Sequence, residues 1–121
     1  MARVREYFVF QNNATGSTNG EELIVEKELS NIAVLDSDVI VIDISGTATS
    51  GTTQFEIKVT PDTDYRAIAG VRNSDFKLAT STSGINEAWI FDIGAFYSFR
   101  CRLIDVTGGY ITIKSKVSKN N

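Results

Sequence analysis

The sequence predicts an all-β protein, built as a single antiparallel β-sandwich of the jelly-roll-like kind with about eight strands. Short runs with alternating polar and apolar residues recur along the chain. Side chains two apart along a strand share a face, so each such run forms a strand with one buried side. Turn-forming residues separate the runs at intervals of roughly 8–12 residues, which is typical of sandwiches.

The first half of the chain contributes four of these runs. Residues 6–11 end at a segment rich in Asn and Gly, 12–20, and residues 22–26 follow it. Residues 21–35 are the only candidate for a helix, and the β-branched Val25, Ile32 and Val34 favour a strand there. Residues 38–45 and 52–59 lie on either side of a turn that has glycine at both ends.

The second half contributes four more runs. Residues 64–69 follow a Pro-Asp-Thr-Asp turn, and residues 87–93 follow a turn rich in serine and glycine. The last two, 97–106 and 110–117, are separated by Thr-Gly-Gly. We therefore expect one domain spanning residues 1–121, which is long enough for a single core.

The last two runs predict a hairpin with a definite register. Their apolar positions must share one buried face, and opposed residues on paired strands point the same way. A three-residue loop that pairs Val106 with Tyr110 satisfies this, with a glycine available for the left-handed position. The buried set is then Phe99, Cys101, Leu103, Ile111, Ile113 and Val117.

This register predicts a cationic patch on the outer face of the hairpin. Arg102 stands opposite Lys114, and Arg100 opposite Lys116. Opposed like charges destabilise a sheet slightly, so something should offset them. Neighbouring acids and solvent are the favoured explanation, with the acids being Asp43, Glu56 and Asp92. A surface on an acidic partner is the alternative.

Two runs are apolar on both faces. In residues 38–45 three isoleucines form one face, while Val39 and Val41 lie on the other. In residues 87–93, Trp89 lies on one face of the strand and Ile90 on the opposite face. Such strands are either covered twice or expose an aliphatic patch to a partner. Val39, Val41 and Ile90 are thus candidates for an apolar contact.

Composition narrows the function further. The 121 residues carry a net charge of −3, which gives no electrostatic case for binding nucleic acid. The N-terminus lacks the apolar core of a signal peptide, and no apolar stretch approaches the roughly 20 residues of a membrane span. We expect a protein made in the cytoplasm, without an N-terminal secretion signal. The single cysteine, Cys101, cannot form an internal disulfide and is expected to be buried.

No catalytic set is evident. The chain has no histidine, which removes Ser-His-Asp and Cys-His catalysis and the commonest zinc ligand. The turn at 46–51 has two glycines but lacks the lysine of a phosphate-binding loop. Asp62, Asp64, Glu87 and Asp92 could supply an acid pair for glycoside hydrolysis, but a chain this small has no extended insertion to build a cleft. Asp36 with Asp38 and Asp62 with Asp64 could hold calcium, but local turn capping through side-chain hydrogen bonds is favoured. We expect no enzyme, no metal and no cofactor.

Aromatic residues offer a weak signal for sugar binding. Tyr65 lies near a predicted turn, and Tyr110 points outward in the predicted hairpin. Trp89 alternates in phase with core residues and is expected inside. Tyr65 and Tyr110 are therefore the candidates for a carbohydrate platform.

Several segments resemble a family of small β-sandwich virion structural proteins, the head decoration or accessory proteins of tailed bacteriophages. In that family a strand ending in a Ser-Gly-Thr turn leads to a Phe-Glu strand and then to an aromatic-Ala-Ile segment. Here Tyr65 stands where Trp is common in the family. The matching segments are residues 43–48, 54–56, 64–71, 76–82, 87–93 and 99–103.

The resemblance implies a non-enzymatic virion protein that binds the head shell and associates with copies of itself. Its partners would be other virion proteins, the major capsid protein above all, with no nucleic acid and no membrane. Its location would be the virion, after synthesis in the host cytoplasm. The alternative is a carbohydrate- or receptor-binding module of a tail or head fibre, which would contact a surface glycan.

Overall fold

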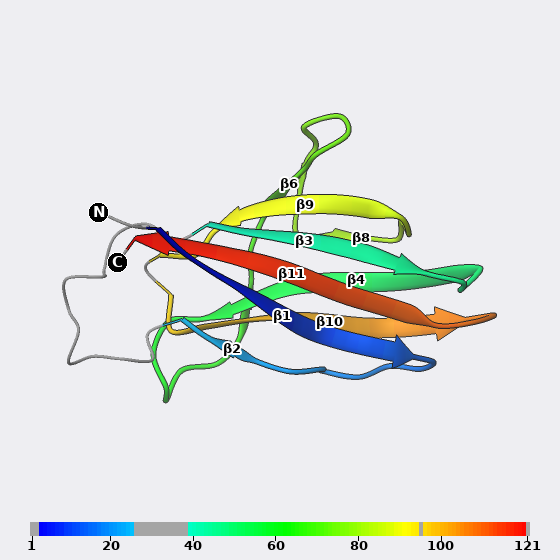
Figure 1. Ribbon diagram of the computed structural model, residues 1–121. Helices are drawn as coiled ribbons and strands as arrows, with labels where there is room; N and C mark the ends of the chain where they lie inside the picture. Colours follow the sequence, from blue (N-terminus) through cyan, green and yellow to red (C-terminus); the bar gives the residue numbers. More distant parts are fainter. Residues whose placement is uncertain (1–2, 26–38, 95, 121) are drawn as a thin grey trace.

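The computed structural model describes residues 3–25, 39–94 and 96–120, and shows two antiparallel sheets packed face to face (Figure 1). No helix occurs in these segments. The eleven strands are β1 (Arg3–Ala14), β2 (Leu23–Ile24), β3 (Val39–Gly46), β4 (Ser50–Lys58), β5 (Arg66–Ala67), β6 (Gly70–Arg72), β7 (Leu78–Ala79), β8 (Ser81–Thr82), β9 (Glu87–Asp92), β10 (Ser98–Thr107) and β11 (Ile111–Asn120). The predicted all-β sandwich is confirmed.

The strands divide between a six-stranded and a five-stranded sheet. The first has the order β1-β11-β3-β9-β6-β7. The second has the order β2-β10-β4-β5, and β8 also pairs with β4. Among the described strands, consecutive ones therefore stay in the same sheet only from β4 to β5 and from β6 to β7, and the chain changes sheet at all the remaining connections.

The eight predicted runs each contain a strand, but three short strands were not expected. β6, β7 and β8 hold two or three residues each, too few for an alternating pattern to stand out from the sequence. They build a small hairpin and a sheet crossing at one edge of the sandwich.

The predicted hairpin of the last two strands is wrong. β10 pairs with β4 and β2 in the five-stranded sheet, whereas β11 pairs with β1 and β3 in the six-stranded sheet. The two strands are joined by an arch, so their apolar faces meet across the core instead of lying side by side. An arch buries the same residues as a hairpin, so alternation alone does not distinguish them. The predicted buried set is confirmed, from Phe99 to Val117.

The arch after β10 stacks on a second arch between β3 and β4. Backbone hydrogen bonds join them, from Thr47 N–H to Tyr110 O at 2.9 Å and from Thr49 N–H to Thr107 O at 2.8 Å. Gly108 has a φ of 76°, which confirms the expected left-handed glycine. The two stacked arches close one end of the sandwich.

The core is a chain of aromatic rings drawn alternately from the two sheets. Phe10, Phe99, Phe91, Phe55 and Trp89 contact one another in that order, with ring centroids 4.7–5.5 Å apart. Edge-on and tilted packing of this kind is favourable between rings. Trp89 is fully buried, as expected, and so is Cys101. Burial raises the pKa of the Cys101 thiol, which keeps it in the unreactive protonated form.

Candidate functional site

A row of mainly apolar side chains crosses the outer face of the six-stranded sheet. The strand registers place one residue of every strand in this row, namely Tyr7, Lys116, Val41, Ile90, Val71 and Leu78. Tyr7 is 80% exposed, Leu78 68%, Val41 42% and Ile90 37%. At about 4.8 Å between strands, the row is roughly 24 Å long. We call it the apolar row.

The structure brings together two of the three predicted apolar contact residues. Val41 and Ile90 are direct cross-strand partners at the centre of the apolar row. Val39 lies two residues from Val41 on the same face, half-buried and opposite Asp92. Among the described residues nothing covers Val41 or Ile90, so the alternative of a position beneath a loop finds no support there.

Two of the predicted cations lie on this same face, and each faces a neighbour on the sheet. Lys114 stands opposite Asp43 on β3. The Lys116 ammonium lies 5.8 Å from the centre of the Tyr7 ring, within reach of a cation–π contact. Because lysine carries a long aliphatic stem, Lys116 adds apolar surface to the row while its charge stays in water.

The other two predicted cations, Arg100 and Arg102, lie on the outer face of the five-stranded sheet. They flank Glu56 of β4, which is 4% exposed. Arg100 Nε donates to Glu56 Oε1 at 2.7 Å, and Arg102 Nη1 to Oε2 at 3.3 Å. Gln54 Nε2 donates to Oε2 at 2.8 Å. We call this group the Glu56 cluster.

The predicted four-cation patch is therefore wrong. Since β10 and β11 belong to different sheets, Arg100 and Arg102 lie on one outer face and Lys114 and Lys116 on the other. The favoured explanation for the arginines, neutralisation by a neighbouring acid, holds for Glu56. A role of these four residues in partner binding stays a prediction.

Tyr65 is held in place by neighbours on the five-stranded sheet. The Arg100 guanidinium lies 3.8 Å from its ring centre, and its hydroxyl lies 2.9 Å from Ser98 Oγ. The hydroxyl also donates to the Glu22 carboxylate. Burial and then this hydrogen bond raise the pKa of Tyr65 to about 12. A ring with Arg100 over its face is a poor free surface for stacking a sugar.

The two tyrosines proposed as a carbohydrate platform lie far apart. Tyr65 bonds to Ser98 at the start of β10, whereas Tyr110 bonds to Thr47 beyond the end of β10. Ten residues of extended strand span roughly 30 Å. The structure does not bring Tyr65 and Tyr110 into one site.

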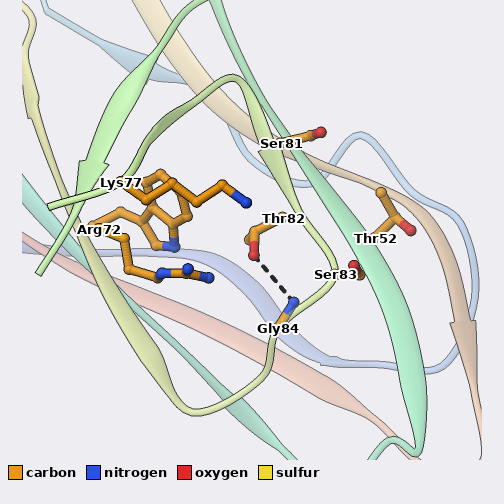
Figure 2. Close-up of a pocket in the computed structure, with 8 residues that line it drawn as sticks. Thr52, Arg72, Lys77, Ser81, Thr82, Ser83 and Gly84 are labelled. Atoms are coloured by element: carbon orange, nitrogen blue, oxygen red, sulfur yellow. Dashed lines mark hydrogen bonds between the residues drawn. The ribbon is translucent and has the colours of Figure 1, made fainter. Parts of the chain in front are cut away.

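A polar cavity of about 200 Å³ lies at the edge of the sandwich, where the chain crosses from β7 to β8. Figure 2 shows the side chains of Arg72 and Lys77 on one side of it and those of Ser81, Thr82 and Thr52 across from them. Ser83, Gly84 and Trp89 complete the lining. We call it the edge cavity.

Glu87 organises the wall of the edge cavity. Its carboxylate accepts hydrogen bonds from Thr82 Oγ1, from Trp89 Nε1 at 2.9 Å and from Arg72 Nη1 at 3.4 Å. Arg72 also binds Asp75 through two N–H groups, at 2.8 and 2.9 Å. This pairing lowers the pKa of Asp75 to about 2. A Cβ on Gly84 would lie 2.1 Å from Glu87 Oε2, so any larger residue there would displace the Glu87 carboxylate from this position.

The acid pairs show local contacts where they are described. Asp62 accepts a hydrogen bond from Thr60 Oγ1 at 2.7 Å, which lowers the pKa of Asp62. Asp36 and Asp38 lie outside the described residues. Across residues 3–25, 39–94 and 96–120, no group of three or more metal-ligating side chains gathers. No helix in those segments is long and apolar enough to cross a membrane.

Sequence reasoning missed the edge cavity and most of the apolar row. Tyr7, Val71, Leu78 and Lys116 join Val41 and Ile90 only through the register of six strands, and residues remote in sequence set that register. Arg72 and Lys77 stand on strands and a turn too short to show a pattern. The alternation around Val41 and Ile90 was the one signal that pointed to this face.

Comparison with known proteins gives relatives over nearly the whole chain. The XepA family model matches residues 5–117. The SPbeta prophage-derived protein YomS of Bacillus subtilis (strain 168) is 32% identical over 112 residues, covering 91% of this chain and 84% of YomS. The phage-like element PBSX protein XepA of the same strain is 31% identical over 107 residues. That match covers 88% of this chain and 35% of XepA.

Solved structures of both relatives share the fold. The crystal structure of YomS matches with a TM-score of 0.84 at 29% identity, over 98% of this chain and 96% of YomS. The crystal structure of the PBSX exported protein XepA matches with a TM-score of 0.86 at 30% identity, over 98% of this chain. The match spans 39% of that XepA structure.

Proposed function

Because this chain belongs to the XepA family, whose prophage-derived members share its fold, we propose that it is a non-enzymatic structural protein of a bacteriophage particle. The finer proposal is a head decoration or accessory protein that binds the shell, the major capsid protein above all, and associates with copies of itself. Its support is phage ancestry combined with a surface suited to packing.

The apolar row is the observation that carries the proposal. Exposed apolar residues scattered singly are normal on soluble proteins, but a contiguous set marks an interaction surface. Here Val41, Ile90, Val71 and Leu78 are consecutive cross-strand neighbours. A flat sheet face of this kind suits the same face of a second copy, because such packing makes each apolar row cover the other.

Charges beside the apolar row also suit packing against a second copy. Lys114 and Asp43 stand opposite each other in the next register position, and Asp92 stands opposite Val39 on the other side. Both signs of charge therefore border the row, so a two-fold related copy can set the cations of one face against the acids of the other. Rim charges of this kind contribute to orientation more than to affinity.

Incorporation into particles tests the proposed role. An Ile90→Glu variant in the phage background should be strongly depleted from purified particles, because it places a charge in the centre of the contact. An Ile104→Glu variant is the matched control, since Ile104 is 40% exposed, nearly as much as Ile90, but stands on β10 of the other sheet. Absence of the unmodified protein from particles would contradict the proposal.

The predicted cation contacts can be tested in the same assay. Charge reversal at Lys116, which lies in the apolar row, should reduce incorporation into particles. Charge reversal at Arg102, which lies on the five-stranded sheet, should leave the contact made by the apolar row unchanged. Equal incorporation of both variants would remove Lys116 from the contact.

The alternative of a glycan- or receptor-binding module stays a prediction with less structural support. Its two tyrosines lie at opposite ends of the sandwich, and the ring of Tyr65 has Arg100 over it. Binding to a glycan array that is lost in a Tyr110→Ala variant would favour this alternative.

A further inference from the structure

We propose that the edge cavity binds a phosphate group, either free or as the end of a small phosphate ester. The cavity lies between the two sheets, with cationic side chains on the β6–β7 side and hydroxyl groups on the β8 side (Figure 2). This inference is independent of the proposed role in a phage particle. It rests on which hydrogen-bonding groups in the cavity remain unused.

The cationic side of the cavity has donors to spare. A guanidinium has five N–H donors, and the hydrogen bonds of Arg72 to Asp75 and Glu87 use three of them. One N–H therefore remains on each terminal nitrogen. The Lys77 ammonium has three donors and forms no hydrogen bond or salt bridge within the described segments.

The hydroxyl side adds further donors. Ser81, Ser83 and Thr52 line the cavity, and their hydroxyls have no hydrogen-bond partner among the residues that the structure describes. Thr82 is different, because its hydroxyl donates to Glu87 and accepts from Gly84 N–H at 3.1 Å. Thr82 thus shapes the wall, while the other three hydroxyls have no partner among the described residues and are available to a ligand.

The Glu87 carboxylate does not prevent an anion from binding, because hydrogen bonds and an ion pair already offset its negative charge. Three donors, from Thr82, Trp89 and Arg72, converge on its carboxylate. Asp75 is likewise committed to Arg72. The two acids hold Arg72 in place. Among the described residues that line the cavity, Lys77 is the cation without a salt-bridge partner. The unused capacity of the cavity is mostly donors, which matches a ligand made mostly of acceptors.

Tetrahedral phosphate fits this arrangement better than a planar carboxylate. Donors reach the cavity from both sides, and phosphate presents oxygens in several directions. A volume of about 200 Å³ lies below the roughly 300–1,000 Å³ of sites for drug-sized ligands. The space therefore suits a single charged group with a short attachment and excludes an extended chain.

Titration of the folded, full chain tests the proposal. Sodium phosphate added at constant ionic strength, with sodium chloride as the reference, should produce saturable NMR shifts of the Gly84 amide and the Trp89 indole N–H. Lys77→Gln should weaken binding about tenfold through loss of a charge-assisted hydrogen bond. Lys58→Gln, at the end of β4 and outside the lining of the cavity, should leave the affinity unchanged.

A second ligand and a second variant keep the test decisive. Glycerol 3-phosphate that binds more tightly than inorganic phosphate would identify the ester as the ligand, and equal binding would identify free phosphate. Ser83→Ala should weaken both ligands by a smaller factor than Lys77→Gln. The proposal is wrong if neither phosphate compound shifts these signals beyond the chloride reference, or if Lys77→Gln and Lys58→Gln bind phosphate equally well.

Discussion

The two outer faces of the sandwich come from similar strands but differ in how their side chains are satisfied. On the five-stranded sheet the Glu56 carboxylate accepts bonds from Arg100, Arg102 and Gln54, and Arg100 also covers Tyr65. On the six-stranded sheet Val41, Ile90 and their neighbours find no cover among the described residues. The charged and aromatic side chains of the first face find partners among the described residues, whereas the second leaves a contiguous apolar row exposed, which we propose is covered by a second copy.

The two outer faces are therefore expected to matter for different properties of the protein, one for the stability of the monomer and the other for association. Ion pairs and stacked rings on the outer face of the five-stranded sheet stabilise the monomer, so substitutions there should affect unfolding. Exposed apolar residues on the other face contribute little to the monomer, so substitutions there should affect association. The stability of variants on each face therefore tests whether the outer face of the five-stranded sheet stabilises the monomer more than the outer face of the six-stranded sheet does.

Glu56→Gln should lower the free energy of unfolding by about 2 kcal/mol. The substitution keeps the shape of the side chain but leaves Arg100 and Arg102 without their anion at a site with little access to water. Urea unfolding followed by Trp89 fluorescence measures the change. A loss below about 0.5 kcal/mol, the range of ordinary surface changes, would show that the Glu56 cluster does not stabilise the monomer.

Stability should fall by up to about 1 kcal/mol between pH 10 and pH 12 because of Tyr65, with its partial exposure limiting the effect. An unfolded tyrosine loses its proton near pH 10, whereas the folded Tyr65 keeps its proton to about 12. The unfolded state then binds fewer protons, so the free energy of unfolding decreases as the pH rises.

Comparison with a Tyr65→Phe variant isolates this contribution. The wild-type protein should lose more stability than the variant over the same pH range. Absorbance at alkaline pH should show a late-titrating tyrosine in the wild type that is lost in the variant. Identical pH profiles would contradict the described environment of Tyr65.

Asp43→Asn should change the free energy of unfolding by less than about 0.5 kcal/mol. Asp43 and Lys114 are exposed cross-strand neighbours on the outer face of the six-stranded sheet, where pairing in water contributes little. The same urea assay measures it. An effect as large as that of Glu56→Gln would erase the distinction between the two faces.

The sequence determined more of the core than of the surface. Alternation identified the strands and the buried residues from Phe99 to Val117, because burial depends mainly on the local pattern of each strand. It did not determine which strands pair, since an arch and a hairpin bury the same side chains. For that reason the pairing of Arg100 with Lys116 was wrong, while the burial of Cys101 was right.

The candidate surfaces depended on long-range register that no local pattern encodes. Val41 and Ile90 were found from their alternation, but Tyr7, Val71 and Leu78 join them only because β1, β6 and β7 pair in one particular register. The edge cavity depends on strands of two or three residues. Such features become visible once the fold is known.

Sedimentation velocity of the purified chain shows whether copies of the protein associate through the apolar row. The wild-type protein should sediment as a concentration-dependent oligomer, Ile90→Glu as a monomer, and Ile104→Glu like the wild type. At a protein concentration low enough for all three to be monomeric, they should unfold at similar urea concentrations, because neither substituted residue is buried. A wild-type protein that stays monomeric at high concentration, or an Ile90→Glu variant that assembles as well as Ile104→Glu, would contradict the claim that the apolar row is an interface between copies.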